Sequence, residues 1–324
     1  MNLTLAICVY NAAKYIEKTL ESVLAQTSSD FHLLIINDCS TDDSVALIER
    51  FFILHPRQYE LVNLDRNQGI CYARHFAERH ATTKYMMFLD ADDILYPHAM
   101  ETMYKKIMSD PDLMAVGCYL EYIDSLGRKL GGGIFLGETT KEAFYEKASK
   151  AKLIFMQPTA IYDREVALSV GGYMIDGYPE GRPRYQDYCE DLDLWTRMSD
   201  LYTEGKAIVV VPQILCSYRK GGGLSSNSFN MILKMRYTKM NLLLRREGGG
   251  NVLTFSDFYK SLSKKELTRY KRYADSADCL RNGVFLIKSG YLLRGIYNIV
   301  RSIWYNPNYI VEKISKNLIK HKKY

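Results

Sequence analysis

The stretch from Tyr85 to Asp93 constrains the fold of this chain more than any other. Five consecutive apolar or aromatic residues, Tyr85 to Leu89, are typical of a short strand buried on both faces, and the carboxylates Asp90, Asp92 and Asp93 follow directly. In parallel α/β sheets, ligands bind at the carboxyl ends of the strands, where acids can hold a divalent cation that grips phosphate oxygens. The alternative is an acidic turn in which Asp93 caps the next helix.

Strand-like and helix-like segments alternate before this stretch. Strands are expected at residues 3–10, 31–37 and 60–64, and helices after Asn11, after the polar cluster at 38–42 and over 70–79. Such alternation with short links predicts a parallel sheet covered by helices on both faces. The sequence has neither a G-x-G-x-x-G after the first strand nor a Walker lysine loop, so it supports neither a dinucleotide site nor a P-loop.

Composition places the chain among folded globular proteins. Hydrophobic residues make up 47% and charged residues 25% of the 324 positions. The seven cysteines include no C-x-x-C pair, and the sequence contains neither a secretory signal pattern nor an apolar run of the roughly 18 to 20 residues that span a membrane. These features favour a cytoplasmic protein in a reducing compartment.

Charge is distributed unevenly along the chain. Residues 241–324 contain 17 Lys or Arg against 6 Asp or Glu, whereas residues 1–240 contain 26 against 31. We therefore expect an α/β domain over 1–240 and a basic helical C-terminal region over 241–324, with Gly248-Gly249-Gly250 as the joint.

Five landmarks follow one another over roughly the first 225 residues. They are Val9-Tyr10-Asn11, the segment from Asn37 to Asp42, the segment from Gly69 to Arg74, the segment from Leu89 to Asp93, and the segment from Glu190 to Arg197 preceded by Gly171-Gly172-Tyr173. In this order and spacing they resemble the landmarks of family 2 glycosyltransferases with the GT-A fold, of the type that builds bacterial surface polysaccharide. The resemblance implies a Rossmann-like nucleotide-diphospho-sugar transferase domain with a mainly α-helical tail.

The resemblance also implies a nucleotide-sugar donor. Tyr10 would lie against the nucleobase and Asp38 would accept a hydrogen bond from its N–H edge, which favours UDP. Arg74 would pair with the base edge or the diphosphate. The family usually has two acids where this chain has Asn37-Asp38, and an amide oxygen can still accept a hydrogen bond.

Further donor contacts are expected from three other segments. Asn11 and Ala91 belong to the donor-binding landmarks, and Arg219 begins a glycine-rich segment, 219–226, that suits either a lid over the diphosphate or an ordinary surface loop. Asp92 is the first choice as a ligand of Mn²⁺ or Mg²⁺, and Asp90 shares the metal or faces the ribose. The metal would stabilise the charge on the departing diphosphate.

Transfer with inversion needs a general base that removes the proton of the acceptor hydroxyl. The resemblance points to Asp191 for this role, with Glu190 fixing the helix end or the acceptor. Trp195, one helical turn on, shares a face with Asp191 and would stack on an acceptor sugar or belong to the core, and Asp93 would contact the sugar or cap a helix. For the acids at 187–193, a cluster favoured by the helix dipole is the alternative.

The C-terminal region has a pattern of its own. Residues 283–305 are rich in Leu, Ile, Tyr and Trp with Lys288, Arg294 and Arg301 interspersed, and Lys320-His321-Lys322-Lys323 follows near the end. Basic and aromatic side chains at helical spacing indicate either a helix in a membrane interface or a helix packed on the α/β domain. No nucleic-acid-binding module accompanies them.

The sequence thus predicts an inverting, metal-dependent hexosyltransferase. It would move sugar from a UDP-sugar to a hydroxyl of a lipid-linked polysaccharide acceptor, at the cytoplasmic face of the membrane. Two alternatives are a haloacid-dehalogenase-like phosphatase with Asp90 as nucleophile and a catalytically inert nucleotide-sugar-binding protein.

Overall fold

The structure is a computed structural model that describes residues 1–221, 223–247, 252–288, 290–309, 311 and 313. The chain forms two compact units. Unit 1 comprises Met1–Gly223 and Thr238–Val252, and unit 2 comprises Leu224–Tyr237 and Leu253–Tyr324. Residue 240, where charge divides the chain, lies inside helix α8 (Ser228–Arg246). The expected joint at Gly248-Gly249-Gly250 falls outside the described residues.

Unit 1 contains a mixed sheet. Its strands are β1 (Leu3–Val9), β2 (His32–Asn37), β3 (Glu60–Asn63), β4 (Tyr85–Asp90), β5 (Ile94–Leu95), β6 (Leu113–Ile123), β7 (Lys129–Ile134), β8 (Ala160–Asp163) and β9 (Ala207–Arg219). Across the described residues the strand order is β3-β2-β1-β4-β8-β6-β9-β5, with β7 paired to β6. The strands β3, β2, β1 and β4 are mutually parallel, and β8 is antiparallel to both of its neighbours.

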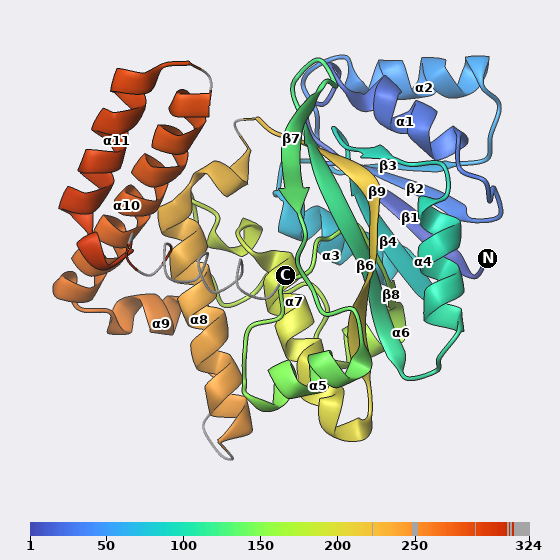
Figure 1. The fold of residues 1–324 in the computed structure, drawn as a ribbon. Coiled ribbons are helices and arrows are strands. Elements are labelled where there is room, and N and C mark those ends of the chain that lie inside the picture. The colour runs from blue at the N-terminus through green and yellow to red at the C-terminus, as the bar shows by residue number, and fades with distance from the viewer. Residues whose placement is uncertain (222, 248–251, 289, 310, 312, 314–324) are drawn as a thin grey trace. The chain divides into compact units, whose positions relative to one another are not determined.

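Helices cover both faces of this sheet, as Figure 1 shows, with α1, α2 and α4 on one side and α3 and α7 on the other. The helices of unit 1 are α1 (Ile16–Leu24), α2 (Ser44–Leu54), α3 (Ile70–His80), α4 (Ala99–Met108), α5 (Lys141–Ser149), α6 (Arg164–Ser169) and α7 (Glu190–Met198). All seven residues of β1 are buried, because a parallel strand in the middle of a sheet has helices over both faces. The predicted α/β class is confirmed.

One local expectation, that Asp93 caps the next helix, was wrong. Helix α4 begins at Ala99 with His98 as its N-cap, so Asp93 does not cap it. The turn at 91–93 has a different role, described below.

Unit 2 is helical, as the sequence predicts. Besides the first part of α8 it contains α9 (Phe255–Ser261), α10 (Lys264–Lys288) and α11 (Leu292–Tyr305). In the described part of the chain, no helix has both the length and the apolar character that a membrane crossing requires.

Candidate active site

The carboxyl ends of three strands lie level at one edge of the sheet. Val9 of β1 is opposite Asn37 of β2, and Cys8 of β1 is opposite Asp90 of β4. Strands β2 and β3 lie on one side of β1 and β4 lies on the other, and ligands of α/β proteins bind in the crevice where the strand order reverses in this way. Tyr10, which follows β1, is 46% exposed beside this point.

Arg74, on α3, joins two acids that are far apart in the sequence. Its Nη2 donates to Asp90 Oδ1 at 2.7 Å, and its Nη1 donates to Glu190 Oε1 at 2.6 Å. The guanidinium is only 3% exposed. The sequence placed Arg74 at the base edge or the diphosphate, but its two terminal nitrogens are bound to acids instead. Arg74 therefore bridges the end of β4 and the start of α7.

The acids near the start of α7 differ in their partners. Asp193 accepts hydrogen bonds from Arg197 and Thr238, Asp187 accepts one from the backbone N–H of Cys71, and Glu190 accepts one from Arg74. Among the described residues, Asp191 has no side-chain partner. A simple acid cluster at a helix N-terminus does not account for this arrangement, because each of the other three acids has a specific structural partner.

Burial raises the pKa of Glu190, Asp191 and Asp92 at this edge. The pKa of Glu190 rises to about 8, with Arg74 opposing the effect of burial. Burial raises the pKa of Asp191 as well, and Arg74 again opposes it. The pKa of Asp92 rises to about 6 through burial and the neighbouring charge of Asp90. A carboxylate with a raised pKa accepts a proton more readily, as a general base must.

Asp90 and Asp92 fit the oxygen ligands that Mn²⁺ and Mg²⁺ prefer. The carboxylate of Asp92 has no side-chain partner in the described part of the chain, whereas one oxygen of Asp90 is held by Arg74. Within the same residues there is no group of three or more His, Cys, Asp or Glu side chains that would hold a metal alone. Diphosphate oxygens and water would have to complete the coordination of a metal at this pair.

Arg219 and Asp93 hold the acidic turn in place. The Nε of Arg219 donates to the carbonyl of Asp92 at 2.8 Å, its Nη1 donates to the carbonyl of Asp124 at 2.6 Å, and its guanidinium lies 4.5 Å from the ring centre of Tyr15. Asp93, which is 2% exposed, accepts the backbone N–H of Arg219. The predictions that Arg219 covers the diphosphate and that Asp93 meets the acceptor therefore need correction, since both groups support the turn from behind. Ala91 is buried in the same turn, and its carbonyl accepts a hydrogen bond from Thr19.

Asp38 and Asn11 organise the loops on the other side of β1. Asp38 Oδ1 accepts the N–H of Gln68 at 2.7 Å, and its Oδ2 accepts the N–H of Gly69 at 2.8 Å. Asp38 is 3% exposed, and burial raises its pKa. Asn11 has a left-handed backbone, with φ 51°, and its Oδ1 accepts the N–H of Thr41. Asn11 does not cap α1, which begins only at Ile16.

Trp195 lies in the core and not at the acceptor side. Its side chain is completely buried, its Nε1 donates to the carbonyl of Met156 at 3.1 Å, and its ring meets Tyr162 edge-on. The predicted stacking on an acceptor sugar is wrong, because the α7 face that carries Trp195 packs against the rest of unit 1.

Sequence reasoning missed the residues that support the loop at 67–71. Arg184 donates to the backbone carbonyl and to Oδ1 of Asn67, and its Nε lies 3.1 Å from Asp187 Oδ2. Gly69, with φ 98°, lies so close to the Asp187 carboxylate that a Cβ would collide with it. Gly69 was the single signal in the sequence, since nothing near Arg184 marks it as a partner of that loop.

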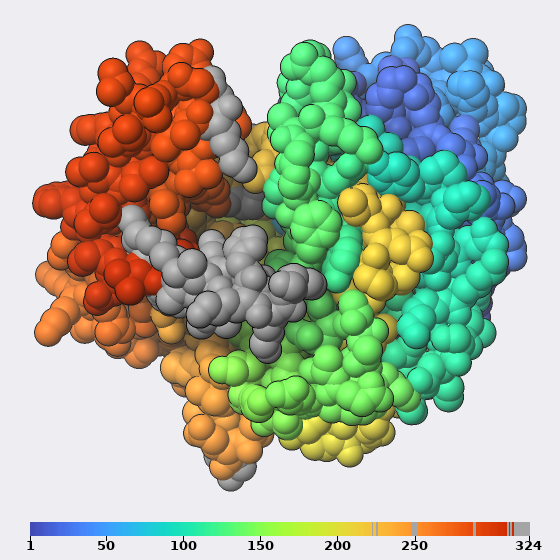
Figure 2. Space-filling model, in the orientation of Figure 1, coloured from blue at the N-terminus to red at the C-terminus, as the bar shows by residue number. Residues whose placement is uncertain are grey.

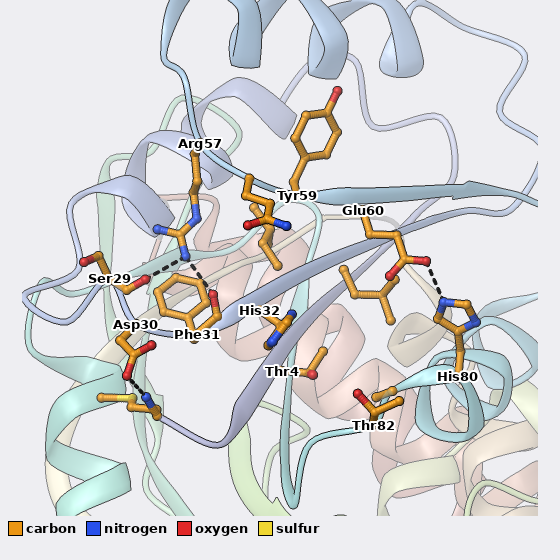
Figure 3. A pocket seen from close by; sticks show the side chains of 15 residues that line it. Thr4, Ser29, Asp30, Phe31, His32, Arg57, Tyr59, Glu60, His80 and Thr82 are labelled. Atoms are coloured by element: carbon orange, nitrogen blue, oxygen red, sulfur yellow. Dashed lines mark hydrogen bonds and ion pairs between the residues drawn. The ribbon is translucent and has the colours of Figure 1, made fainter.

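A cavity of about 760 Å³ lies elsewhere in unit 1. Figure 3 shows its lining, which includes His32, Arg57, Glu60 and His80. His32, Arg57 and Glu60 lie at or before the amino ends of β2 and β3, and His80 is the last residue of α3. The cavity is therefore at the opposite edge of the sheet from the acids, and it is not the predicted donor site.

Comparisons with known proteins agree with this geometry. The family model of glycosyl transferase family 2 matches residues 4–169. The teichoic acid poly(glycerol phosphate) polymerase of Staphylococcus epidermidis is 38% identical over 113 residues, which cover 35% of this chain and 16% of that protein. The glycosyltransferase GlyA of Streptococcus pneumoniae is 29% identical over 153 residues, which cover 47% of this chain and 21% of that protein. The chain thus spans about a fifth or less of the length of these curated relatives.

The fold has known counterparts as well. The structure of S. aureus TarS 1-349 in complex with UDP aligns with 98% of this chain and 92% of that chain, with a TM-score of 0.55 at 16% sequence identity. The likeness shows that unit 1 has the fold predicted for it. The family match contains Asp90 together with the first three landmarks, which leaves the phosphatase alternative without support.

Proposed function

This chain belongs to glycosyl transferase family 2, and we propose that it transfers a hexose, with inversion, from a UDP-sugar to a hydroxyl group of a polysaccharide-type acceptor. The observation that carries the proposal is the bridge through Arg74, which joins Asp90 of the donor-side turn to Glu190 beside Asp191. Acids a hundred positions apart in the sequence thereby belong to one cluster at the edge where α/β proteins bind ligands.

The donor would lie against Tyr10, with the diphosphate at Asp90 and Asp92. These two carboxylates would hold Mn²⁺ or Mg²⁺, which acts as a Lewis acid on the leaving diphosphate. The complex of a mannosyltransferase from Pyrobaculum calidifontis with GDP-Man and Mn²⁺ shares this fold at 17% identity and a TM-score of 0.53, and TarS has been seen with UDP-GlcNAc. Asp38, which is buried beside the base position, favours uracil, whose N–H would share this carboxylate with the loop at 67–69.

Asp191 would act as the general base. The acceptor oxygen attacks the anomeric carbon from the face opposite the diphosphate, its proton passes to the Asp191 carboxylate, and the bond from the anomeric carbon to the phosphate oxygen breaks with its electron pair leaving on the diphosphate. Burial, which raises the pKa of Asp191, favours this transfer of a proton. Glu190 would hold the guanidinium of Arg74 in place, and Arg74 would hold Asp90 at a fixed position relative to the general base Asp191.

The acceptor would be a growing, lipid-linked glycan at the cytoplasmic face of the membrane. The teichoic acid poly(glycerol phosphate) polymerase and the chondroitin synthase of Escherichia coli, which is 34% identical over 127 residues, are by name enzymes that make polymers, and this supports a polymeric acceptor. We propose that the basic helical region of unit 2 brings the enzyme to that membrane surface. Its terminal basic cluster at 320–323 lies outside the described residues.

The direct test combines donor binding with turnover. Thermal melting with UDP, GDP and their sugars should show the largest rise for UDP compounds, and only with Mn²⁺ or Mg²⁺, because ligands that bind the native state stabilise it. Asp191→Asn should keep this rise while transfer falls by about 10²- to 10⁴-fold, the range typical for loss of a general base.

The matched control is Asp43→Asn, an exposed aspartate whose side chain makes no capping hydrogen bond. It should leave both readouts unchanged. Unchanged turnover in Asp191→Asn would remove Asp191 from its role, and binding without any turnover in the wild type would favour an inert binding protein.

A further inference from the structure

Helices α10 and α11 pack through small residues. Gly283 and Gly295 face each other so closely that a Cβ on Gly295 would lie 2.8 Å from the carbonyl oxygen of Gly283. Two helical turns along the same seam, the hydroxyls of Ser276 and Ser302 lie 2.9 Å apart, and both residues are fully buried. We call this contact line, made of these two glycines and two serines, the small-residue seam.

Such a seam is unusual for a hairpin in water. Soluble helix pairs normally bury their largest apolar side chains against each other, because the hydrophobic effect stabilises the pair. Small residues and hydrogen-bonded serines at the contact are typical of helices that associate in lipid. Within the seam each glycine lies beside an isoleucine of the other helix, Gly283 beside Ile299 and Gly295 beside Ile287. Other large apolar side chains of α11 are exposed.

These side chains lie on the side of α11 that faces away from the seam. Leu293, Tyr297, Val300 and Trp304 follow one another at helical spacing, and their exposed fractions are 83%, 62%, 56% and 73%. Leu292, Ile296 and Ile303 flank them, and Phe285 of α10 is 62% exposed. Figure 2 shows α10 and α11 as the orange and red surface of unit 2. We call the seven α11 residues the apolar stripe.

The charge near the stripe has one sign. Arg294 and Arg301 are seven positions apart, so both lie along the same edge of the stripe, and both are exposed. From Cys279 to Val311 the sequence contains no Asp or Glu. An apolar stripe bordered by arginines, with a tryptophan and a tyrosine on it, matches the boundary between headgroups and acyl chains of an anionic bilayer.

We propose that the apolar stripe of α11 inserts into the headgroup region of an anionic lipid bilayer, with Arg294 and Arg301 on lipid phosphates. The inference rests on the membrane association proposed above and assigns it to one helix face. The small-residue seam leaves this face available, because the seam lies on the opposite side of α11.

A second copy of the chain is the other candidate partner, and charge argues against it. A two-fold pairing of stripes would bring four arginines to one interface with no acid between Cys279 and Val311 to neutralise them. An anionic lipid surface supplies the missing charge and the apolar medium together.

Vesicle flotation of the full chain tests the proposal. The protein should float with vesicles of equal parts phosphatidylglycerol and phosphatidylcholine, and much less with phosphatidylcholine alone. Leu293→Glu with Val300→Glu should lower the bound fraction by roughly tenfold or more, since both side chains would leave the apolar layer. Arg294→Gln with Arg301→Gln should lower the affinity for the anionic vesicles by about fivefold for each arginine.

The matched control is Ile53→Glu on α2, where the isoleucine is 77% exposed and belongs to unit 1. It should float like the wild type. Trp304 gives an independent signal: in a Trp195→Phe background it is the one tryptophan of the sequence, and its emission should shift to the blue with anionic vesicles.

Three results would overturn the proposal. The first is a wild-type protein that stays in the soluble fraction. The second is a Leu293→Glu, Val300→Glu variant that floats as well as the wild type. The third is a wild-type protein that forms a dimer and binds no vesicles, and that these two substitutions convert to a monomer. The melting shift with UDP and Mn²⁺ is measured on the same samples. It should be equal in all variants, and its absence would count against sugar transfer without touching the vesicle result.

Discussion

Charged and apolar side chains are distributed in opposite ways in two regions of the molecule, the acidic edge of the sheet in unit 1 and the α10–α11 hairpin of unit 2. At the edge, the buried charge of Arg74 has two acids within 2.7 Å, and the large apolar side chains beside it, such as Phe88, are in the core. In the hairpin, the glycines and serines of the small-residue seam are in the buried contact, whereas Leu293 and Trp304 are exposed.

The difference shows what each region is built to meet. Buried charges are costly unless each is paired, so the paired charges at the edge fit the proposed site for a charged small ligand. An exposed apolar stripe is costly in water and stable in lipid, so the hairpin fits the proposed contact with a lipid surface.

Removing the bridge at the edge should have the largest effect. Arg74→Met would leave the mostly buried Glu190 and the partly exposed Asp90 without their cation, and the free energy of unfolding should fall by about 3–5 kcal/mol, as for other broken buried pairs. Arg74→Lys should lower the free energy of unfolding by a smaller amount, because a single ammonium group cannot contact both acids as the guanidinium does. Urea unfolding measures both changes.

Arg50→Met is the matched control for this change. Arg50 pairs with Glu17 at 3.1 Å, but both side chains are largely exposed, and exposed pairs contribute less than about 1 kcal/mol. Equal losses in Arg50→Met and Arg74→Met would mean that the edge cluster is an ordinary surface network.

Filling the small-residue seam should have an intermediate effect. In Gly295→Val the new side chain would press on Ile287 and on the carbonyl oxygen of Gly283, and overpacking of this kind costs about 1–3 kcal/mol. A thermal melt followed by circular dichroism should show an earlier loss of helical signal. Gly221→Val, where no atom lies within 4 Å of the new Cβ, should melt like the wild type. A seam that tolerates valine would have to be loosely packed.

A buried acid beside the edge should give the smallest effect. Glu78 is fully buried and accepts hydrogen bonds from Tyr162 and from the N–H of Tyr173, and burial raises its pKa. As pH rises past about 4.5, Glu78 ionises in the unfolded chain but stays protonated in the folded protein. The free energy of unfolding should therefore fall until the pH passes the raised pKa of Glu78, by about 1.4 kcal/mol per unit of pKa shift. Glu78→Gln should flatten this decline. An identical pH profile would show that another group causes it.

The sequence predicted the edge better than the hairpin because strand ends are marked by local patterns. The run from Tyr85 to Leu89 and the acids after it predicted β4 and the turn at Asp90 and Asp92, and the structure places them so. The partners of Arg74, Arg219 and Trp195 were not predictable in this way. Each depends on residues more than 30 positions away, such as Glu190, Asp124 and Met156, and no local pattern records such contacts.

In the hairpin the pattern was visible but its geometry was not. Apolar and basic residues at helical spacing indicated an amphipathic helix, but they left open which face meets the neighbouring helix. That choice depends on Gly283 meeting Gly295 and Ser276 meeting Ser302 across the turn between the helices. The serine pair is 26 positions apart, beyond what helical periodicity can relate.

The most direct test of the central claim is a crystal structure with UDP and Mn²⁺, using the anomalous signal of manganese to locate the metal. We predict one peak bound by Asp92 and the diphosphate, with the Asp191 carboxylate facing the position of the sugar across the same crevice. A peak away from Asp92, or UDP in the cavity lined by His32 and Arg57, would contradict the claim that the acids after β4 and at the start of α7 form one site for sugar transfer.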